Sequence, residues 1–292
     1  FFITEHGILT TGFPEGKNIS VFPGYEVTTS CGHFNLLGIR YMPEKLLTKG
    51  PAPEWDYLEK MVIEMKERGA LFSVNHPFFK PWQWIYDSMP LSLIDCIEIV
   101  TDPYDAHIGD TNELAVKMID LLWNEGYRVT GIGGSDTHTA FSGSQLGQPL
   151  TEVYSVPGSM KSLLGALKRN NAAVYLDTGC RIFYSMEGSE VLPGAEIRTG
   201  RDADLLITAM HNEDSDPLLL RIVENGNVTG EHEIPAGRTS AIEKKWGAGS
   251  GWLRCELRDK NGILKGFINP IHRGGRAGGI KTWKDAVAKL GY

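Results

Sequence analysis

The sequence lacks the features that mark membrane, disulfide-rich secreted and nucleic-acid-binding proteins. No apolar run approaches the roughly 20 residues that a transmembrane helix needs. The net charge of −7 argues against a surface for nucleic acid or for an anionic membrane, which would need a basic stripe. The few cysteines form no Cys-x-x-Cys pair, so we expect reduced, structural thiols. They are Cys31, Cys96, Cys180 and Cys255.

Two further absences concern the chemistry and the start of the chain. No Gly-x-Ser-x-Gly segment occurs, which argues against a serine nucleophile. The chain opens on an apolar run, Phe1–Thr4, without an initiator Met, and we expect it to begin within a strand. No signal peptide is visible, so a cytoplasmic location is the default expectation, with export left open.

The 292 residues suffice for one large α/β domain and a smaller partner. Up to residue 178, short apolar strands alternate with amphipathic helices, a pattern typical of parallel strands in an α/β sheet or barrel. Helices are expected over 54–68 and 112–125, each followed by a glycine, and a third follows Ser159 as N-cap. The expected strands are residues 1–4, 34–40, 70–75, 96–100, 128–132, 152–156 and 172–176.

The pattern changes near residue 178. Residues 179–273 alternate apolar and polar side chains with period two, and Asn225-Gly226 and Asn261-Gly262 are hairpin-type turns. We therefore expect a small antiparallel β-domain, sandwich-like, without catalytic residues of its own. The tail, 274–292, is expected to include a helix over 281–290.

The strongest chemical signal is Gly133-Gly134-Ser135-Asp136-Thr137-His138, directly after an expected strand. Asp136 and His138 are two residues apart, so in an extended chain both side chains point the same way. A carboxylate and an imidazole at the end of a strand suit a divalent metal. The alternative is a polar loop in which Asp136 caps a helix and His138 is incidental.

Further candidate ligands lie on other strands or strand ends. His76 follows residues 70–75, Glu26 and His33 flank a turn, and His6 ends the first strand. Glu98 lies inside the apolar segment 95–100, where a carboxylate must be paired, neutral or metal-bound. Each is weak alone, since a lone histidine beside a strand is more often a packing residue. Together they predict a metal site, because strand ends converge on one face of an α/β barrel.

The other histidines carry less weight. We expect His211 and His232 to be structural or surface residues, and give His107 and His272 a smaller chance of reaching the site. Arg40, just after its strand, is a candidate contact for an anionic substrate group, with a solvated loop residue as the alternative.

The order of these segments resembles the PHP (polymerase and histidinol phosphatase) superfamily of metal-dependent phosphoesterases. Over residues 1–272, including a C-terminal Asn269-Pro270 pair, the chain looks similar to the CehA/McbA-like branch. The matching segments are Thr4-Glu5-His6, Pro23-Gly24-Tyr25-Glu26, Gly32-His33, His76-Pro77, Ile97-Glu98-Ile99 and Gly134-Ser135-Asp136-Thr137-His138.

This resemblance implies a distorted (β/α)7 barrel that holds two or three divalent ions, commonly zinc, iron or manganese. It implies metal-ligand roles for His6, Glu26, His76, Asp136 and His138, with Glu26 as a bridging carboxylate. It implies less uniform ligand roles for His33 and Glu98. The family's opening His-x-His motif is absent, so we expect fewer ions and weak or no hydrolysis. Where the family's second motif has Asp-His, this chain has Glu5-His6.

The expected function is metal-dependent hydrolysis of a small-molecule ester, with a phosphate ester favoured and a metal-bound hydroxide as nucleophile. Asp136 or Glu26 is the candidate proton acceptor. A carboxylic or carbamic ester on the same site is the first alternative. The second is a non-catalytic degenerate barrel that carries a ligand-binding β-domain. The oligomeric state is left open, and no nucleic-acid or membrane partner is expected.

Overall fold

The computed structural model describes residues 1–13, 19–41, 53–101, 109–138, 147–176, 178–198, 200–212, 215–249, 251–275 and 278–292. The elements up to Tyr175 are β1 (Phe2–Ile3), β2 (Phe22–Thr29), β3 (Gly32–Leu37), α1 (Trp55–Glu67), β4 (Leu71–Val74), the 3-10 helix η2 (Leu91–Leu93), β5 (Cys96–Thr101), α2 (Gly109–Asn124), β6 (Thr130–Gly134), β7 (Leu150–Val153), α3 (Met160–Leu167) and β8 (Ala172–Tyr175). The remaining elements are β9 (Cys180–Met186), β10 (Ser189–Val191), β11 (Ala203–His211), β12 (Leu218–Glu224), β13 (Asn227–Ile234), β14 (Arg238–Trp246), β15 (Gly251–Arg258), β16 (Leu264–Arg273) and α4 (Trp283–Leu290).

The first sheet has the strand order β1-β2-β3-β4-β5-β6. The expectation of parallel strands is correct only in part. β1–β2, β4–β5 and β5–β6 are parallel, whereas β3 runs antiparallel to both of its neighbours. The reason is the short turn between Thr29 and Gly32, which allows a hairpin but not the crossover that parallel strands need. β2 itself was not expected as a strand.

A closed (β/α)7 barrel is not confirmed. Along the described chain the first sheet ends at β6, and β7 and β8 belong instead to a second sheet of order β13-β12-β15-β16-β8-β7. β8 pairs with β16 through Val174 and Phe267. One sheet therefore spans both sides of residue 178, and the division of the chain at that residue stays a prediction.

The helices follow from their local sequence. α1 turns Trp55, Leu58 and Met65 into the main core. Ser159 caps α3 as expected, its hydroxyl accepting a hydrogen bond from the Ser162 amide at 3.2 Å. The expected C-terminal helix is present as α4, which begins with a Thr282 capping box. No described helix has the length and hydropathy needed to cross a bilayer, and all the cysteines are free.

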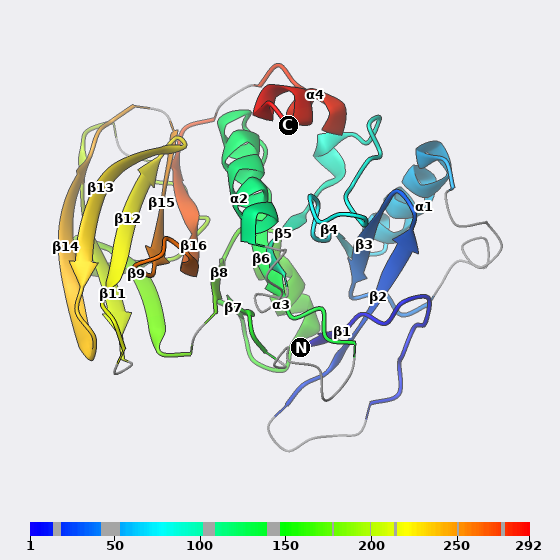
Figure 1. Ribbon diagram of the computed structural model, residues 1–292, viewed down its shortest axis with the longest axis horizontal. Helices are drawn as coiled ribbons and strands as arrows, with labels where there is room; N and C mark the ends of the chain where they lie inside the picture. The colour runs from blue at the N-terminus through cyan, green and yellow to red at the C-terminus, as the bar shows by residue number, and fades with distance from the viewer. Residues whose placement is uncertain are drawn as a thin grey trace.

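The C-terminal half is a sandwich of antiparallel strands, as the period-two pattern predicted. A sheet of order β10-β9-β11-β14 faces the second sheet across an apolar core that includes Ile182, Ile207 and Leu220. Figure 1 shows these strands on the left, the first sheet on the right and α2 between them.

Asn269 joins the two sheets where the first one ends. Its side-chain oxygen accepts a hydrogen bond from the Gly131 amide at 2.8 Å. Its side-chain nitrogen donates to the carbonyls of Gly131 and Ala172 at 2.9 and 2.8 Å. Fully buried, this amide thus fills the break between β6 and β8 and satisfies backbone groups that have no strand partner there.

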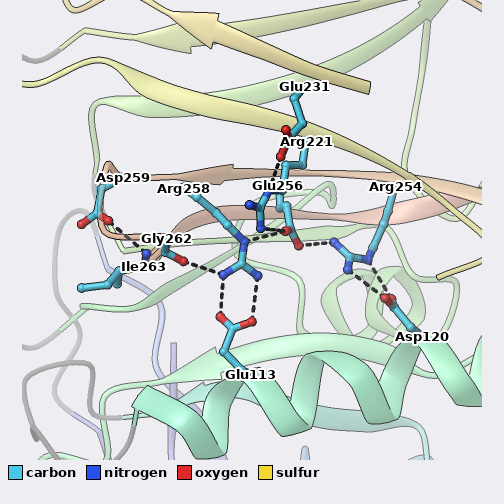
Figure 2. A network of polar contacts seen from close by, with 10 residues as sticks. All are labelled: Glu113, Asp120, Arg221, Glu231, Arg254, Glu256, Arg258, Asp259, Gly262 and Ile263. Atoms are coloured by element: carbon cyan, nitrogen blue, oxygen red, sulfur yellow. Dashed lines mark hydrogen bonds and ion pairs between the residues drawn. The ribbon is translucent and has the colours of Figure 1, made fainter. Parts of the chain in front are cut away.

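A buried network of charges attaches α2 to β15 (Figure 2). Arg254 forms a two-pronged pair with Asp120, at 2.7 and 2.8 Å, and also donates to Glu256. Arg258 donates to Glu256 at 2.6 Å and forms a second two-pronged pair with Glu113. The planar guanidinium suits both pairs, since its N–H groups match the two oxygens of a carboxylate.

The network predicts a pH dependence of stability. Burial alone would raise the pKa of Glu256, but Arg254 and Arg258 lower it to about 2. A lowered folded-state pKa gives stability that is present above the ordinary value of 4.5 and is lost as the pH falls toward 2. The stability advantage of the wild type over Glu256→Gln should therefore shrink by about 1.4 kcal/mol per pH unit below this value. Urea unfolding at several pH values measures it, and a constant difference would contradict the prediction.

Candidate metal centre

The residues proposed as metal ligands come together at one edge of the first sheet, although they are far apart in sequence. His76 follows β4, and Asp136 and His138 follow β6, as expected of strand ends. His33 instead stands near the start of β3, which is brought to the same edge because β3 runs antiparallel. The remaining members are His6, bridged to β2 beside Glu26, Glu26 itself and Glu98 within β5.

Glu26, His33 and His76 form the buried floor of this site. Their side chains are exposed by only 7%, 7% and 3%. Oε1 of Glu26 lies 3.1 Å from Nδ1 of His33 and 4.0 Å from Nε2 of His76. The His33 and His76 rings meet edge to face, with centroids 5.0 Å apart. Both histidines thus face one carboxylate oxygen.

His6, Asp136 and His138 form the rim, where the site opens to solvent. Their side chains are exposed by 37%, 29% and 58%. Nε2 of His6 lies 2.8 Å from Nε2 of His138. Nδ1 of His138 lies 2.8 Å from the Asp136 carbonyl. A carbonyl only accepts, so Nδ1 carries the hydrogen, and in the neutral ring Nε2 offers its lone pair to the site.

These residues fit a divalent cation. The ligand atoms of His6, Glu26 and His33 lie within 4.8 Å of one another, as do those of His6, Asp136 and His138. Nε2 of His33 and Nδ1 of His76 are buried without a hydrogen-bond partner, and Oε1 of Glu26 and Nδ1 of His33 contact only each other, at 3.1 Å. Unpartnered buried polar atoms cost free energy, which coordination of a cation would offset. The two groups share His6, whose neutral ring offers one lone pair and so serves one group at a time.

The charge states of the floor residues also suit a cation. Burial alone would raise the pKa of Glu26, but contact with His33 and the nearby His6 and His76 rings lowers it below its ordinary value. Burial lowers the pKa of His76. An ionised carboxylate and a neutral imidazole are the forms that bind metal ions.

Glu98 lies beside His76, and its role as a metal ligand stays a prediction. Its Oε2 accepts a hydrogen bond from the His76 amide at 2.9 Å. This bond holds His76 at a φ of 27°, an uncommon backbone conformation for a residue other than glycine. Burial and the charge of Asp136 raise the pKa of Glu98 well above its ordinary value.

Gly134 lies directly against Glu98. A Cβ at this position would lie 2.3 Å from Oε1 of Glu98, so a larger residue there would displace the carboxylate. Gly134 therefore lets the last strand pass beside Glu98 where it now lies.

Arg40 lies away from the site. β3 places His33 near its start and Leu37 at its end, so Arg40 emerges at the opposite edge of the sheet, where it is exposed. The expected contact with an anionic substrate is therefore not supported. Sequence reasoning assumed that a strand's C-terminal end faces the site, and the hairpin reverses that direction.

His107 lies outside the described residues. His272 and His211 lie outside the cluster. His272 is buried on β16, where burial and the charge of Arg128 lower its pKa to about 3. His211 is buried on β11 and contacts Ser215 and the Asp216 carbonyl.

Two site residues were missed from the sequence. Thr28 lies two residues after Glu26 on β2, and its hydroxyl is 2.5 Å from Nδ1 of His6. The period of two along β2 could have indicated it. Trp82 lies with its ring centroid 5.4 Å from that of His33 and is 45% exposed. It comes from an irregular segment, and no sequence pattern signals its position.

Comparisons with known proteins add a partial likeness. No protein-family model matches the chain, and no curated protein matches it. A solved structure from Bacteroides vulgatus, of a two-domain protein containing a predicted PHP-like metal-dependent phosphoesterase, is similar at a TM-score of 0.41 and 16% identity. The alignment covers 90% of this chain and 74% of that one. The geometry of the site, rather than this likeness, is the basis on which a function is assigned.

Proposed function

We propose that this chain is a metal-dependent hydrolase that acts on a phosphate ester. The observation that carries the proposal is the convergence of Glu26, His33 and His76 around one buried carboxylate oxygen, in a cluster that leaves Nε2 of His33 and Nδ1 of His76 without a hydrogen-bond partner. A purely structural cluster of this kind would leave buried polar atoms unsatisfied. The His6, Asp136 and His138 rim supplies an open side where a substrate can approach.

In this proposal the residues of the site have different roles. The chemistry that divalent ions supply in such a centre is a lowered pKa of water and stabilisation of the negative charge on the substrate's phosphoryl oxygen. Glu26, His33 and His76 are the residues that would hold a divalent ion at the buried floor of the site. Asp136 lies at the solvent rim, where its carboxylate is placed to accept a proton from water. Glu98 keeps His76 in place through the backbone.

The substrate class is the finer part of the proposal. A phosphate ester is favoured by the resemblance of the motifs to the PHP superfamily. A carboxylic or carbamic ester is the competing substrate on the same site. The exposed Trp82 indole beside His33 gives an apolar surface on which the non-reacting part of either substrate can rest.

Metal removal and restoration test the proposal. The chain is treated with a chelator and then titrated with Mn²⁺, Zn²⁺ or Fe²⁺, and the melting temperature is followed. Metal that binds only the folded chain should raise the melting temperature. At a metal concentration a hundredfold above Kd, the free energy of unfolding should increase by about 2.7 kcal/mol. Hydrolysis of p-nitrophenyl phosphate, bis-p-nitrophenyl phosphate and naphthyl acetate is measured in parallel.

Each outcome of that panel has a defined meaning. Metal-dependent hydrolysis of the phosphate esters would support the proposal. Hydrolysis of naphthyl acetate alone would show that the substrate is a carboxylic or carbamic ester instead. Metal binding without any turnover favours a non-catalytic barrel. If no metal changed the melting temperature, the proposal of a metal centre would be wrong.

A further inference from the structure

A second candidate site lies at the end of the β-sandwich, away from the metal centre. A cavity of about 590 Å³ is lined by Arg128, Arg198 and Arg273 together with Glu196, Ile197 and the 248–249 and 274–275 turns. Three arginines against one glutamate make this a positively charged cavity in a chain of net charge −7. Such a concentration of one charge favours an anion.

Arg273 is the buried member of this group. It is only 2% exposed, and its guanidinium lies 4.8 Å from the centre of the Trp246 ring. Nη1 donates to the carbonyls of Arg201 and Gly247 at 3.1 and 2.8 Å. Nε and Nη2 have no hydrogen-bond partner. The Nε–Nη2 edge is buried as well as unpartnered. This edge is the one through which a guanidinium can bind two oxygens of a carboxylate or phosphate at once.

The other buried arginines of this chain show what Arg273 lacks. Arg254 and Arg258 each meet a two-pronged carboxylate partner. Among the described residues, no carboxylate lies within ion-pair distance of Arg273. A buried cation without a counter-ion is costly. Carbonyl contacts and ring stacking satisfy some donors but leave the charge unneutralised.

The outer arginines complete the positive wall. Arg128 pairs with Glu196 at 2.6 Å and remains partly exposed. Arg198 is exposed and forms no ion pair within the described part of the chain. An anion that enters the cavity therefore meets a free guanidinium first and the buried one last.

We propose that this cavity binds a small molecule through an oxyanion, a phosphate or carboxylate group, with Arg273 as the buried partner and Arg198 at the entrance. The site is separate from the metal centre. Arg128 precedes β6 and Asp136 follows it, and this strand alone spans about 13 Å.

Calorimetric titration of the full chain with inorganic phosphate and, separately, with acetate and citrate tests the proposal. Chelator is present throughout so that no probe binds through a metal, and chloride keeps the ionic strength constant. Wild type should bind at least one probe, and the stronger one distinguishes phosphate from carboxylate. Arg273→Gln should weaken that binding about tenfold or more, because a charge-assisted pair is lost.

Two further variants keep the test decisive if Arg273→Gln does not fold. Arg198→Glu, an exposed charge reversal, should also weaken binding about tenfold by like-charge repulsion. Arg238→Gln, on the exposed face of β14, is the matched control and should bind as wild type does. Absence of binding at millimolar probe, or equal affinity in wild type and Arg198→Glu, would overturn the proposal.

Discussion

Replacing Glu26 with glutamine should weaken divalent-metal binding at least tenfold and lower kcat/KM on a phosphate ester by about 100-fold or more. Glutamine keeps the size of the side chain but removes the charge. Glu26 is a buried carboxylate that His6, His33 and His76 all approach, at 3.8, 3.1 and 4.0 Å. Calorimetric titration with Mn²⁺ or Zn²⁺ and steady-state kinetics measure the two losses.

Two variants serve as controls for Glu26→Gln. Glu64→Gln removes an exposed carboxylate on α1 by the same chemical change. Arg40→Gln tests the residue that lies at the opposite edge of the sheet. Both should keep wild-type affinity and activity. Equal metal binding in wild type and Glu26→Gln would mean that the floor of the site is not a metal centre.

Replacing Asp120 with alanine should lower the free energy of unfolding by about 3 kcal/mol, the cost of breaking a buried ion pair. The Arg254 side chain is 3% exposed and would keep only Glu256 as a charged partner. A buried guanidinium with two free donors cannot regain its hydration in the folded chain. Urea unfolding should show a lower midpoint at an unchanged slope.

Lys245→Ala is the matched comparison for this variant. Lys245 pairs with Asp202 at 3.8 Å, but its side chain is 72% exposed. Removing it should change stability by less than about 1 kcal/mol, because water already solvates both charges. Equal losses in the two variants would show that burial adds nothing to the Asp120–Arg254 pair.

Glu26, His33 and His76 illustrate how far the ligands could be predicted from sequence. Each stands on or next to a short apolar segment, where a polar side chain needs a partner. Their meeting required the assumption that strand ends converge, and the structure brings them together. The same assumption misplaced Arg40, because it took no account of the reversed direction of β3.

Glu98 shows a different limit. Its place in an apolar strand predicted a carboxylate that is paired, neutral or bound to a metal. The strand pattern alone does not distinguish these three states. The choice depends on which atom lies opposite, here the His76 amide. Likewise, nothing in the local pattern near residue 250 signals the cavity around Arg273, whose walls come from distant turns.

The sequence by itself determined many of the elements, although β2 was not among those expected. Helical spacing and caps were enough for α1, α3 and α4, and the alternation of apolar and polar residues was enough for the sandwich strands, because these signals act over a few neighbouring residues.

Only the tertiary structure decided what the polar faces do. On β15 the alternation resembles that of a half-exposed strand, yet both faces are buried, since α2 covers Arg254, Glu256 and Arg258. Strand direction, the join of β8 to β16 and the convergence of the metal ligands were decided in the same way. Each depends on contacts between segments distant in the chain, whose free energy of burial and pairing no local pattern contains.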